Sequence, residues 1–296
     1  QSSTGGIRDW VIGMQVVLAD GTITKSGGRV VKNVQGYEMH RLHTGAFGTL
    51  GIVSQVAFKL LPTPPEQQSV IAWFDNQDAA QDVGMSFVNG LFAPEAISLI
   101  HGPATQQVLI EAGETYTSDE TWVLAIRLGG GVRSIERQVN EVVGASGANG
   151  ATGYAVLSDI DASAMWAKLE ETETKSRTII RMTSRTSNAL AASHEIATSN
   201  IKGEKWVSTV CDLGFGAVTV VADLPNDAES LQFINSTVHT IKQHQGSYLI
   251  EKCPLDVKHG MDVFSDVGNS IDLMRRIKNQ YDPSRILNPG RFVGKI

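Results

Sequence analysis

Three prolines within residues 62–65 constrain the fold of this 296-residue chain more than any other feature. Proline has no backbone N–H and forces the residue before it into an extended conformation, so a helix or an interior strand ends at such a cluster. We therefore predict a domain boundary at this point. The sequence then divides into residues 1–63, residues 64–254 and a C-terminal segment, residues 255–296.

Residues 1–63 have the pattern of a small antiparallel sheet. Residues 10–18 are rich in Val and Ile, and Asp20 and Gly21 follow them as a strong turn signal, which predicts a β-hairpin. Residues 37–43 have helical spacing, and residues 52–61 have the composition of a half-covered strand. This part is therefore predicted to hold a hairpin, a short helix and a further strand.

Residues 64–254 alternate between strand-like and helix-like segments. Strands are predicted at residues 69–74, 96–100, 107–110, 122–128, 178–182, 217–223 and 248–251, and helices at residues 78–91, 132–143, 162–171, 189–197 and 228–243. Two rounds of such units predict an α+β fold of the split βαβ, ferredoxin-like type, with antiparallel sheets and helices on one face. Residues 144–153 contain few large apolar side chains and are predicted to form a loop.

The C-terminal segment contains one strong helix signal. A helix is predicted at residues 270–281, and Asp282 with Pro283 ends it. The tail that follows carries Ile286, Leu287 and other apolar residues, so we expect it to pack against the protein rather than to remain loose.

Composition excludes several classes of function. The formal net charge of -6 and the lack of a long basic run argue against nucleic acid as a partner. Cys211 and Cys253 lie far apart in the sequence, so the two thiols alone provide neither a zinc site nor an iron–sulfur site. No metal ligands are assigned. No stretch approaches the ~20 continuous apolar residues that a membrane-spanning helix needs.

Residues 45–52 carry glycines at three-residue spacing just before a predicted strand. Glycine permits positive φ and lets a ligand approach the backbone, so the amides of Gly48 and its neighbours are candidates for binding phosphate or a nucleotide ring. A helix C-terminus followed by a tight turn explains the same pattern equally well.

Four motifs together are more specific than any one of them. Arg-Asp-Trp-Val-Ile-Gly begins at Arg8, Lys-Asn-Val-Gln-Gly-Tyr occupies residues 32–37, the glycine segment covers residues 45–52, and Leu-Asn-Pro-Gly-Arg ends at Arg291. In these motifs the chain resembles the FAD-linked oxidases of the vanillyl-alcohol oxidase and p-cresol methylhydroxylase (PCMH) superfamily. Within that superfamily it looks most like the FAD-binding subunit of bacterial glycolate oxidases.

The resemblance implies the role of each part. Residues 1–63 would be the second half of a PCMH-type FAD-binding domain, residues 64–254 the cap that holds substrate, and residues 255–296 a helix and tail returning to the flavin. The residues that match the family's FAD contacts are Thr4, Gly5, Gly6, Asp9, Gly48, Thr49, Gly51, Ile52, Asn288 and Arg291. For Asp9 a surface pair with Arg8 is an alternative, and for Asn288 a simple turn.

The same resemblance places the family's first FAD subdomain, with its pyrophosphate loop, before Gln1. We therefore expect this stretch alone to bind FAD weakly, because an unpaired, buried pyrophosphate is costly.

On the substrate side the resemblance implies oxidation of a 2-hydroxy acid such as glycolate by hydride transfer to flavin. The His-x-His and Glu-His-Gly metal motifs of catalytic relatives are absent from this sequence. Arg181 is the catalytic candidate, because a cap strand facing flavin can hold a carboxylate with such a side chain. An exposed arginine at a sheet edge is the alternative.

Partners implied by the resemblance are a catalytic flavoprotein subunit and an iron–sulfur subunit, in the cytoplasm or at the inner membrane through those subunits. Two other functions remain open. One is a structural subunit that carries little flavin, and the other is a stand-alone FAD-dependent alcohol oxidase.

Overall fold

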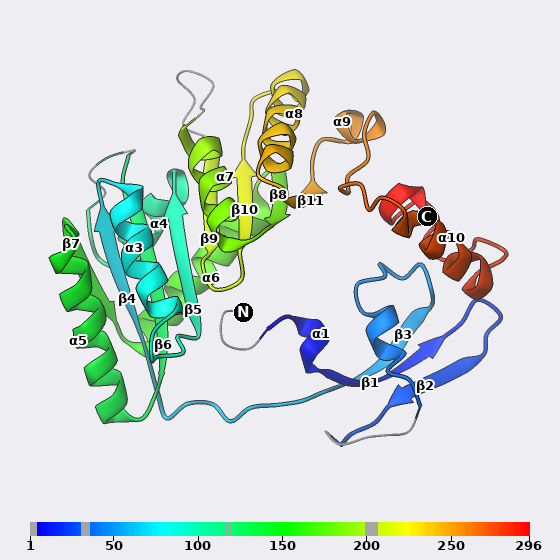
Figure 1. The fold of residues 1–296 in the computed structure, drawn as a ribbon, viewed down its shortest axis with the longest axis horizontal. Coiled ribbons are helices and arrows are strands. Elements are labelled where there is room, and N and C mark those ends of the chain that lie inside the picture. The colour runs from blue at the N-terminus through cyan, green and yellow to red at the C-terminus, as the bar shows by residue number, and fades with distance from the viewer. Residues whose placement is uncertain (1–4, 31–35, 116–117, 119, 199–206) are drawn as a thin grey trace. The chain divides into compact units, whose positions relative to one another are not determined.

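The chain forms two compact units (Figure 1). The structure is a computed structural model that describes residues 5–30, 36–115, 118, 120–198 and 207–296. The large unit comprises Pro64–Met261, and the small unit comprises Gly5–Thr63 together with Asp262–Ile296.

One antiparallel sheet of eight strands is the framework of the large unit. Its strands are β4 (Glu66–Phe74), β5 (Ala96–His101), β6 (Trp122–Gly130), β7 (Gly153–Leu157), β8 (Thr178–Thr183), β9 (Val207–Asp212), β10 (Ala217–Ala222) and β11 (Ser247–Lys252). The spatial order is β11-β8-β10-β9-β5-β6-β4-β7. Strands β4 to β7 form one half of the sheet, and strands β8 to β11 form the other half. From the outer edge of the sheet to its middle, both halves have the same order: fourth, first, third and second strand of the half. That order is the ferredoxin-like arrangement, so the predicted α+β fold is confirmed.

The two halves of this sheet meet at β5 and β9, which pair antiparallel from Ser98 opposite Asp212 to His101 opposite Thr209. Both strands are the second strand of their half, so the sheet is continuous through the joint. The two ferredoxin-like repeats therefore share one sheet instead of forming two separate ones.

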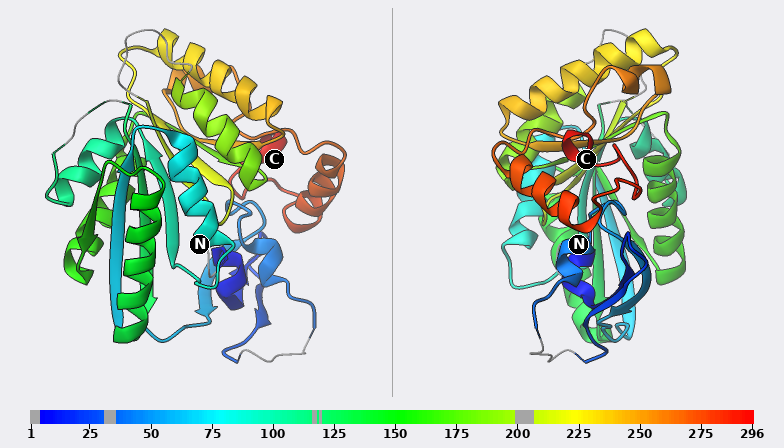
Figure 2. Two further views of the ribbon diagram at one scale, coloured as in Figure 1. Left: turned by 60° about the vertical axis from the view of Figure 1, so that its left-hand side comes forward. Right: turned by 90° about the vertical axis from the view of Figure 1, so that its right-hand side faces the viewer.

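Helices cover both faces of this sheet (Figure 2). They are α3 (Gln77–Val88), α4 (Pro103–Glu111), α5 (Val132–Ala148), α6 (Asp159–Lys175), α7 (Thr186–Thr198) and α8 (Asp227–Gln243), and the short α9 (Leu255–His259) follows β11. A side chain at Gly84 of α3 would contact Leu124 of β6, whereas Met165 of α6 packs in one cluster with Val123. Since Val123 and Leu124 point to opposite faces, α3 and α6 lie on opposite sides of the sheet.

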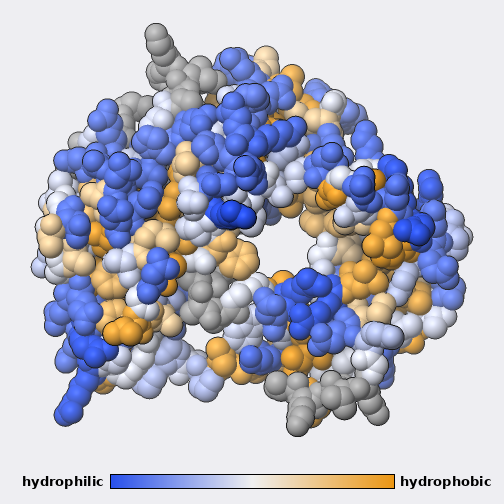
Figure 3. All heavy atoms as spheres, viewed as in Figure 1, coloured by the Kyte–Doolittle hydropathy of each residue, from blue (hydrophilic) through white to orange (hydrophobic). Residues whose placement is uncertain are grey.

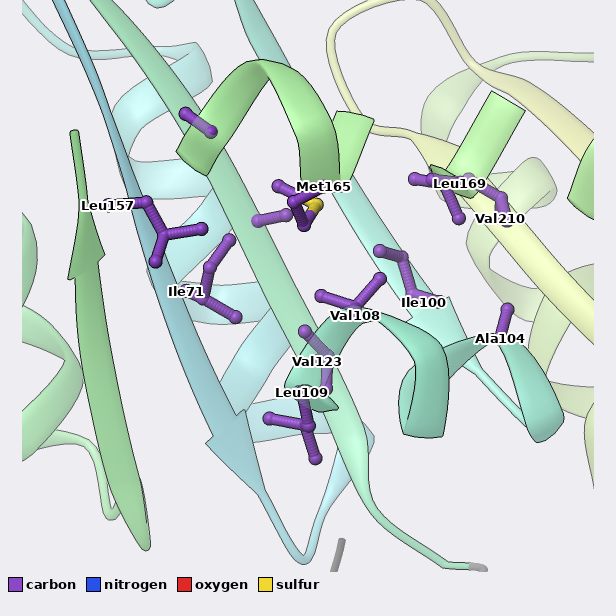
Figure 4. Close-up of a cluster of buried hydrophobic side chains, with 12 residues drawn as sticks. Ile71, Ile100, Ala104, Val108, Leu109, Val123, Leu157, Met165, Leu169 and Val210 are labelled. Atoms are coloured by element: carbon purple, nitrogen blue, oxygen red, sulfur yellow. The ribbon is translucent and has the colours of Figure 1, made fainter. Parts of the chain in front are cut away.

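The face under α4 and α6 holds an apolar core (Figure 4). Met165, Ile71, Val123 and Leu109 are each completely buried there. The prediction that helices lie on one face was therefore wrong for α4 and α6. Their apolar sides need a partner, and the sheet offers apolar side chains on both faces because it is buried on both.

Two local predictions in this unit were wrong. Residues 107–110 belong to α4 and not to a strand, because Gly102 turns the chain with φ +82° and Pro103 occupies the first helical turn. Residues 144–148 continue α5 and are not a loop. Ser146 is buried against the sheet side of that helix, so small residues there allow close packing and do not end it.

The small unit contains a three-stranded antiparallel sheet in the order β2-β1-β3. Its elements are α1 (Ile7–Trp10), β1 (Val11–Val17), β2 (Ile23–Gly27), α2 (His40–His43), β3 (Ile52–Phe58), α10 (Ser270–Tyr281) and the 3-10 turn η1 (Val293–Lys295). The predicted hairpin and the predicted C-terminal helix are confirmed. The buried apolar cluster of this sheet is small, formed by Val11, Met14 and Val16.

Within the described residues, no helix has the length and the apolar character needed to cross a membrane.

Candidate functional site

The glycine turn, residues 44–51, is folded in a conformation that few side chains tolerate. Gly45 has φ +84°, Phe47 +53° and Gly48 +71°, all in the left-handed region. The hydroxyl of Thr49 donates to the carbonyl of Ala46 at 2.7 Å, and Thr49 itself is buried. The turn is therefore held by its own hydrogen bonds in one strained shape.

The C-terminal return, residues 282–292, lies directly against this turn. The side-chain amide of Asn288 donates to the carbonyl of Phe47 at 2.7 Å, across 241 residues of sequence. A Cβ atom at Gly48 would lie 2.7 Å from the same amide nitrogen. Glycine is required at this position both for its φ and for this close approach.

A buried ion pair joins the turn, the return and α10. The ammonium of Lys278 donates to Thr49 O at 2.8 Å, to Leu287 O at 2.8 Å and to Asp282 Oδ2 at 2.6 Å. The Asp282 carboxylate also accepts from the amides of Ile286 at 3.0 Å and Leu287 at 2.8 Å. Both side chains are almost entirely buried, so the three segments are fixed by fully paired charges.

The hydrogen bonds of Asp282 also set its ionisation. Burial by itself would raise its pKa, but the hydrogen bonds from Lys278 and from the amides of Leu287 and Ile286 outweigh burial and lower the pKa below its ordinary value. Asp282 is therefore an anion at neutral pH.

The candidates near the N-terminus form a separate, local cap. Asp9 accepts from the amide of Gly6 at 3.1 Å, and the amide of Asp9 donates back to Gly6 O at 2.9 Å. Asp9 is thereby tied to the first turn of α1, and its carboxylate leaves no room for a side chain at Gly5, where φ is +72°. Thr4 and residues 32–35 lie outside the described residues.

The other predicted FAD contacts differ in how far they are buried. Gly51 is buried, and a Cβ atom there would lie 2.3 Å from Val16 of β1. Ile52 begins β3 with 61% of its surface exposed, and Arg291 is also exposed. The structure therefore brings together Gly48, Thr49 and Asn288. Arg291 is linked to this group through its backbone amide, which donates to Asn288 O at 3.2 Å. Their assignment as flavin contacts stays a prediction.

The turn offers groups suited to a polar, ring-containing ligand. Within the described part of the chain, the amides of Gly45, Phe47 and Gly48 donate to no protein acceptor, and all three residues are exposed. The Phe47 ring packs edge-on against Phe264 and tilted against Phe292, with about half of its surface left open. Free amides beside an open aromatic ring fit the polar atoms and flat rings of a dinucleotide such as FAD.

A cavity of about 520 Å³ lies beside α2 in the small unit, within the size range of ligand cavities. Met14, His43 and Tyr281 are among its lining residues. The ring of His43 meets that of Tyr281 edge-on at 5.7 Å, and burial lowers the pKa of His43 below its ordinary value. His43 is therefore a neutral, ring-packing residue here. Among the described residues, no three His, Cys, Asp or Glu side chains gather as metal ligands.

Arg181, the catalytic candidate, lies on β8 of the large unit with acidic partners. Its guanidinium pairs with Glu251 and, at 3.4 Å, with Glu173, and it also donates to the hydroxyl of Thr219 at 3.1 Å. Burial raises the pKa of Glu173, which Arg181 and Thr219 partly counteract. The positive charge of Arg181 is thus already compensated within the protein.

Lys278 and Asp282 were not among the predicted site residues, although they organise this site. The signal was present, because a Lys and an Asp four residues apart end a helix just before Pro283. Such spacing is common on solvated helices, so only burial distinguishes this pair from a surface one.

Residues 266–292 match the family model of the C-terminal domain of FAD linked oxidases. The chain is 25% identical to glycolate oxidase subunit GlcD of Bacillus subtilis over 310 residues. The matched region covers 98% of this chain and 64% of the relative. The chain is 25% identical to mitochondrial D-lactate dehydrogenase [cytochrome] 1 of Saccharomyces cerevisiae, over 97% of the chain and 52% of the relative. It is 34% identical over 80 residues to glycolate oxidase subunit GlcE of Escherichia coli, 27% of the chain and 23% of the relative.

The fold is shared with a solved xylooligosaccharide oxidase from Myceliophthora thermophila, with a TM-score of 0.62 at 15% identity, over 96% of this chain and 66% of that one. The sequence is thus similar to FAD linked oxidases, and the fold to that of a solved oxidase. These similarities confirm the predicted resemblance to the FAD-linked oxidases of the vanillyl-alcohol oxidase and p-cresol methylhydroxylase superfamily. FAD is the cofactor of this family. The chain spans about two thirds or less of the curated relatives that it matches.

Proposed function

We propose that this chain is part of an FAD-dependent oxidoreductase that oxidises a 2-hydroxy acid such as glycolate, as a subunit of a larger complex. The observation that supports it most is the contact between the glycine turn and the C-terminal return, where Asn288 binds Phe47 O beside the exposed amide of Gly48. These are the segments that carry the family's motifs at the two ends of the chain.

In this proposal the small unit holds FAD through the exposed amides of Gly45, Phe47 and Gly48, with Asn288 fixing the turn. The predicted contacts at Gly5, Gly6 and Asp9 act through the amide end of α1. When bound, FAD supplies the hydride acceptor, and the protein supplies position and electrostatics. The open face of the Phe47 ring offers a stacking surface that excludes water from one side of a bound ring.

The substrate class is proposed from the relatives. Two of them are named as glycolate oxidase subunits and one as a D-lactate dehydrogenase, and glycolate and lactate are both 2-hydroxy acids. The word subunit in two of these names supports a complex, for which we propose a catalytic flavoprotein and an iron–sulfur protein as partners. A cytoplasmic or membrane-peripheral location follows only from such partners.

The charge of Arg181 bears on how substrate is bound. A guanidinium that is already paired with two carboxylates has little net attraction for a third carboxylate, because the negative charges of its partners offset its positive charge. We therefore propose that Arg181 contributes to substrate binding only indirectly, by ordering β8 beside β11 through Glu251.

The test is a titration of FAD, followed by quenching of its fluorescence, into this chain alone and into the chain extended by the preceding FAD subdomain that the resemblance implies. We expect weak binding to the first and tight binding to the second. The flavin absorbance of the second should bleach when glycolate or D-lactate is added without oxygen.

Each outcome separates the alternatives. Equal affinities would refute the expected contribution of the preceding segment. Tight binding with no bleaching by any 2-hydroxy acid, but bleaching by another alcohol, would favour the stand-alone alcohol oxidase. No flavin binding in either form would favour the structural subunit and overturn the proposal.

A further inference from the structure

The buried pair of Lys278 and Asp282 is unusual because every hydrogen-bonding group in it is used. The three N–H groups of Lys278 reach Thr49 O, Leu287 O and Asp282, all within 2.8 Å. Lys278 has 5% of its surface exposed and Asp282 has none. An ammonium with three acceptors and a carboxylate with three donors can be buried without an orphaned charge.

This arrangement differs from an ordinary salt bridge on a helix. Arg275 and Asp272, one turn earlier on α10, lie 3.8 Å apart with more than half of each side chain exposed. A pair of that kind contributes little because solvent screens it. The charges of Lys278 and Asp282 are instead directed at backbone atoms of two other segments, so their main effect is on where those segments lie.

Those two segments contain three of the five described non-glycine residues whose φ lies in the left-handed region. Phe47, Arg285 and Asn288 are non-glycine residues with φ of +53°, +52° and +41°. Such conformations persist only where surrounding contacts determine them. Thr49 lies two residues after Phe47, and Leu287 lies immediately before Asn288. Lys278 therefore donates hydrogen bonds to backbone carbonyls close to both strained residues.

We propose that Lys278 and Asp282 are positioning residues for the flavin site, which hold the glycine turn and the C-terminal return in register so that the Gly48 amide and the Asn288 side chain present one fixed surface to the cofactor. This inference rests on the proposed function and adds the residues that build its site. Neither side chain needs to touch FAD.

The experiment compares three variants in the extended, FAD-binding form of the chain. Lys278→Met leaves a buried carboxylate uncompensated. Lys278→Met combined with Asp282→Asn removes both charges and keeps an oxygen acceptor for one of the two backbone amides, that of Ile286 or that of Leu287. Arg275→Met combined with Asp272→Asn removes an exposed pair from the same helix and serves as the matched control.

The readouts are the Kd for FAD, thermal unfolding of the FAD-free protein, and hydrogen exchange of the amides of residues 45–51 without FAD. We expect Lys278→Met to lose both stability and affinity. The double variant should recover part of the lost stability, because no unpaired charge remains, and still bind FAD roughly 10- to 100-fold more weakly, as a loosened site does. The control should change neither quantity.

If the double variant recovers affinity together with stability, the pair is structural only and the inference fails. If the unmodified protein binds no FAD, the proposed function fails instead, and hydrogen exchange then decides this inference alone. Faster exchange at residues 45–51 in the double variant but not in the control would support the positioning role. Unchanged exchange would overturn it.

Discussion

The two units bury their sheets to very different extents. In the large unit, Ile97, Leu99 and Leu124 are fully buried, and helices cover both faces of the sheet. In the small unit, every residue of β3 is exposed or only half-buried, and apolar side chains reach the surface on the visible face of the molecule (Figure 3). The large unit therefore depends on apolar burial, and the small unit depends more on specific polar contacts.

The difference shows which kind of contact fixes the positions of backbone segments in this protein. Apolar packing is non-directional and tolerates small shifts, whereas a hydrogen-bonded ion pair fixes distances and angles. The segments that carry the flavin motifs lie in the small unit and are tied by the pair of Lys278 and Asp282.

The largest effect is expected in the core of the large unit. Met165→Ala should lower the free energy of unfolding by about 2–5 kcal/mol, because the deleted atoms leave a cavity between α6 and the sheet. Ile160→Ala on the same helix, where the side chain is 82% exposed, should change it by less than ~0.5 kcal/mol. Denaturant unfolding measures both, and equal losses would contradict the comparison.

A smaller effect is expected in the glycine turn. Gly48→Ala should cost about 1–3 kcal/mol, because the residue has φ +71° and its Cβ atom would meet the Asn288 amide. Gly45→Ala is the control, since it has a similar φ of +84° but open space around it. We expect FAD affinity to fall more for Gly48→Ala, which fluorescence titration tests. Equal losses in the two variants would show that the backbone strain alone matters.

Two carboxylates, fully buried Asp282 in the small unit and partly buried Glu173 in the large unit, should respond to pH in opposite directions. The folded-state pKa of Asp282 is lowered, so its stabilisation is complete above its unfolded pKa of about 3.9 and is lost as pH falls through the folded value. The pKa of Glu173 is raised, so its contribution is complete below its unfolded pKa and is lost as pH rises through the folded value.

Unfolding measured across pH tests both signs. Asp282→Asn should flatten the acid side of the stability curve, with a change in slope of at most about 1.4 kcal/mol per pH unit, and Glu173→Gln should raise stability toward neutral pH. A steeper acid side in Asp282→Asn, or a loss of stability at neutral pH in Glu173→Gln, would show that the sign is wrong.

The smallest effect is expected at Arg181. Its side chain is 42% exposed and its pairs are partly screened, so Arg181→Met should change stability by about 1 kcal/mol or less. We also expect KM for a 2-hydroxy acid to change less than tenfold, with Arg181→Lys close to the unmodified protein. A large rise in KM with unchanged stability would restore Arg181 as the residue that binds the substrate carboxylate.

The sequence predicted the helices and strands with strong patterns, and it failed where small residues or mixed apolar runs carry no clear period. The C-terminal helix at residues 270–281 is an example of success, because Asp282 and Pro283 end it visibly. Residues 107–110 are an example of failure. A short run such as Val108-Leu109-Ile110 suits a strand or a buried helix equally, and Gly102 with Pro103 decides for the helix.

The candidate site likewise contains residues that the sequence predicted and a residue that it did not. Gly48 was predicted because a glycine before a strand has few explanations, and Asn288 because its motif resembles the family's ending. The burial of Lys278 could not be predicted. An ion pair four residues apart on a helix looks the same in sequence whether water or the protein surrounds it.

By itself the sequence indicated the resemblance to FAD-linked oxidases, the α+β class and the positions of the turn and the return, since these depend on local residue types. Only the tertiary structure decided that β5 and β9 join two ferredoxin-like repeats into one sheet, that Arg181 is already paired, and that Lys278 binds Thr49 and Leu287. These outcomes depend on contacts between residues far apart in the chain. Burial then determines how much a charge or a glycine contributes to the free energy of folding, which the residue type alone does not reveal.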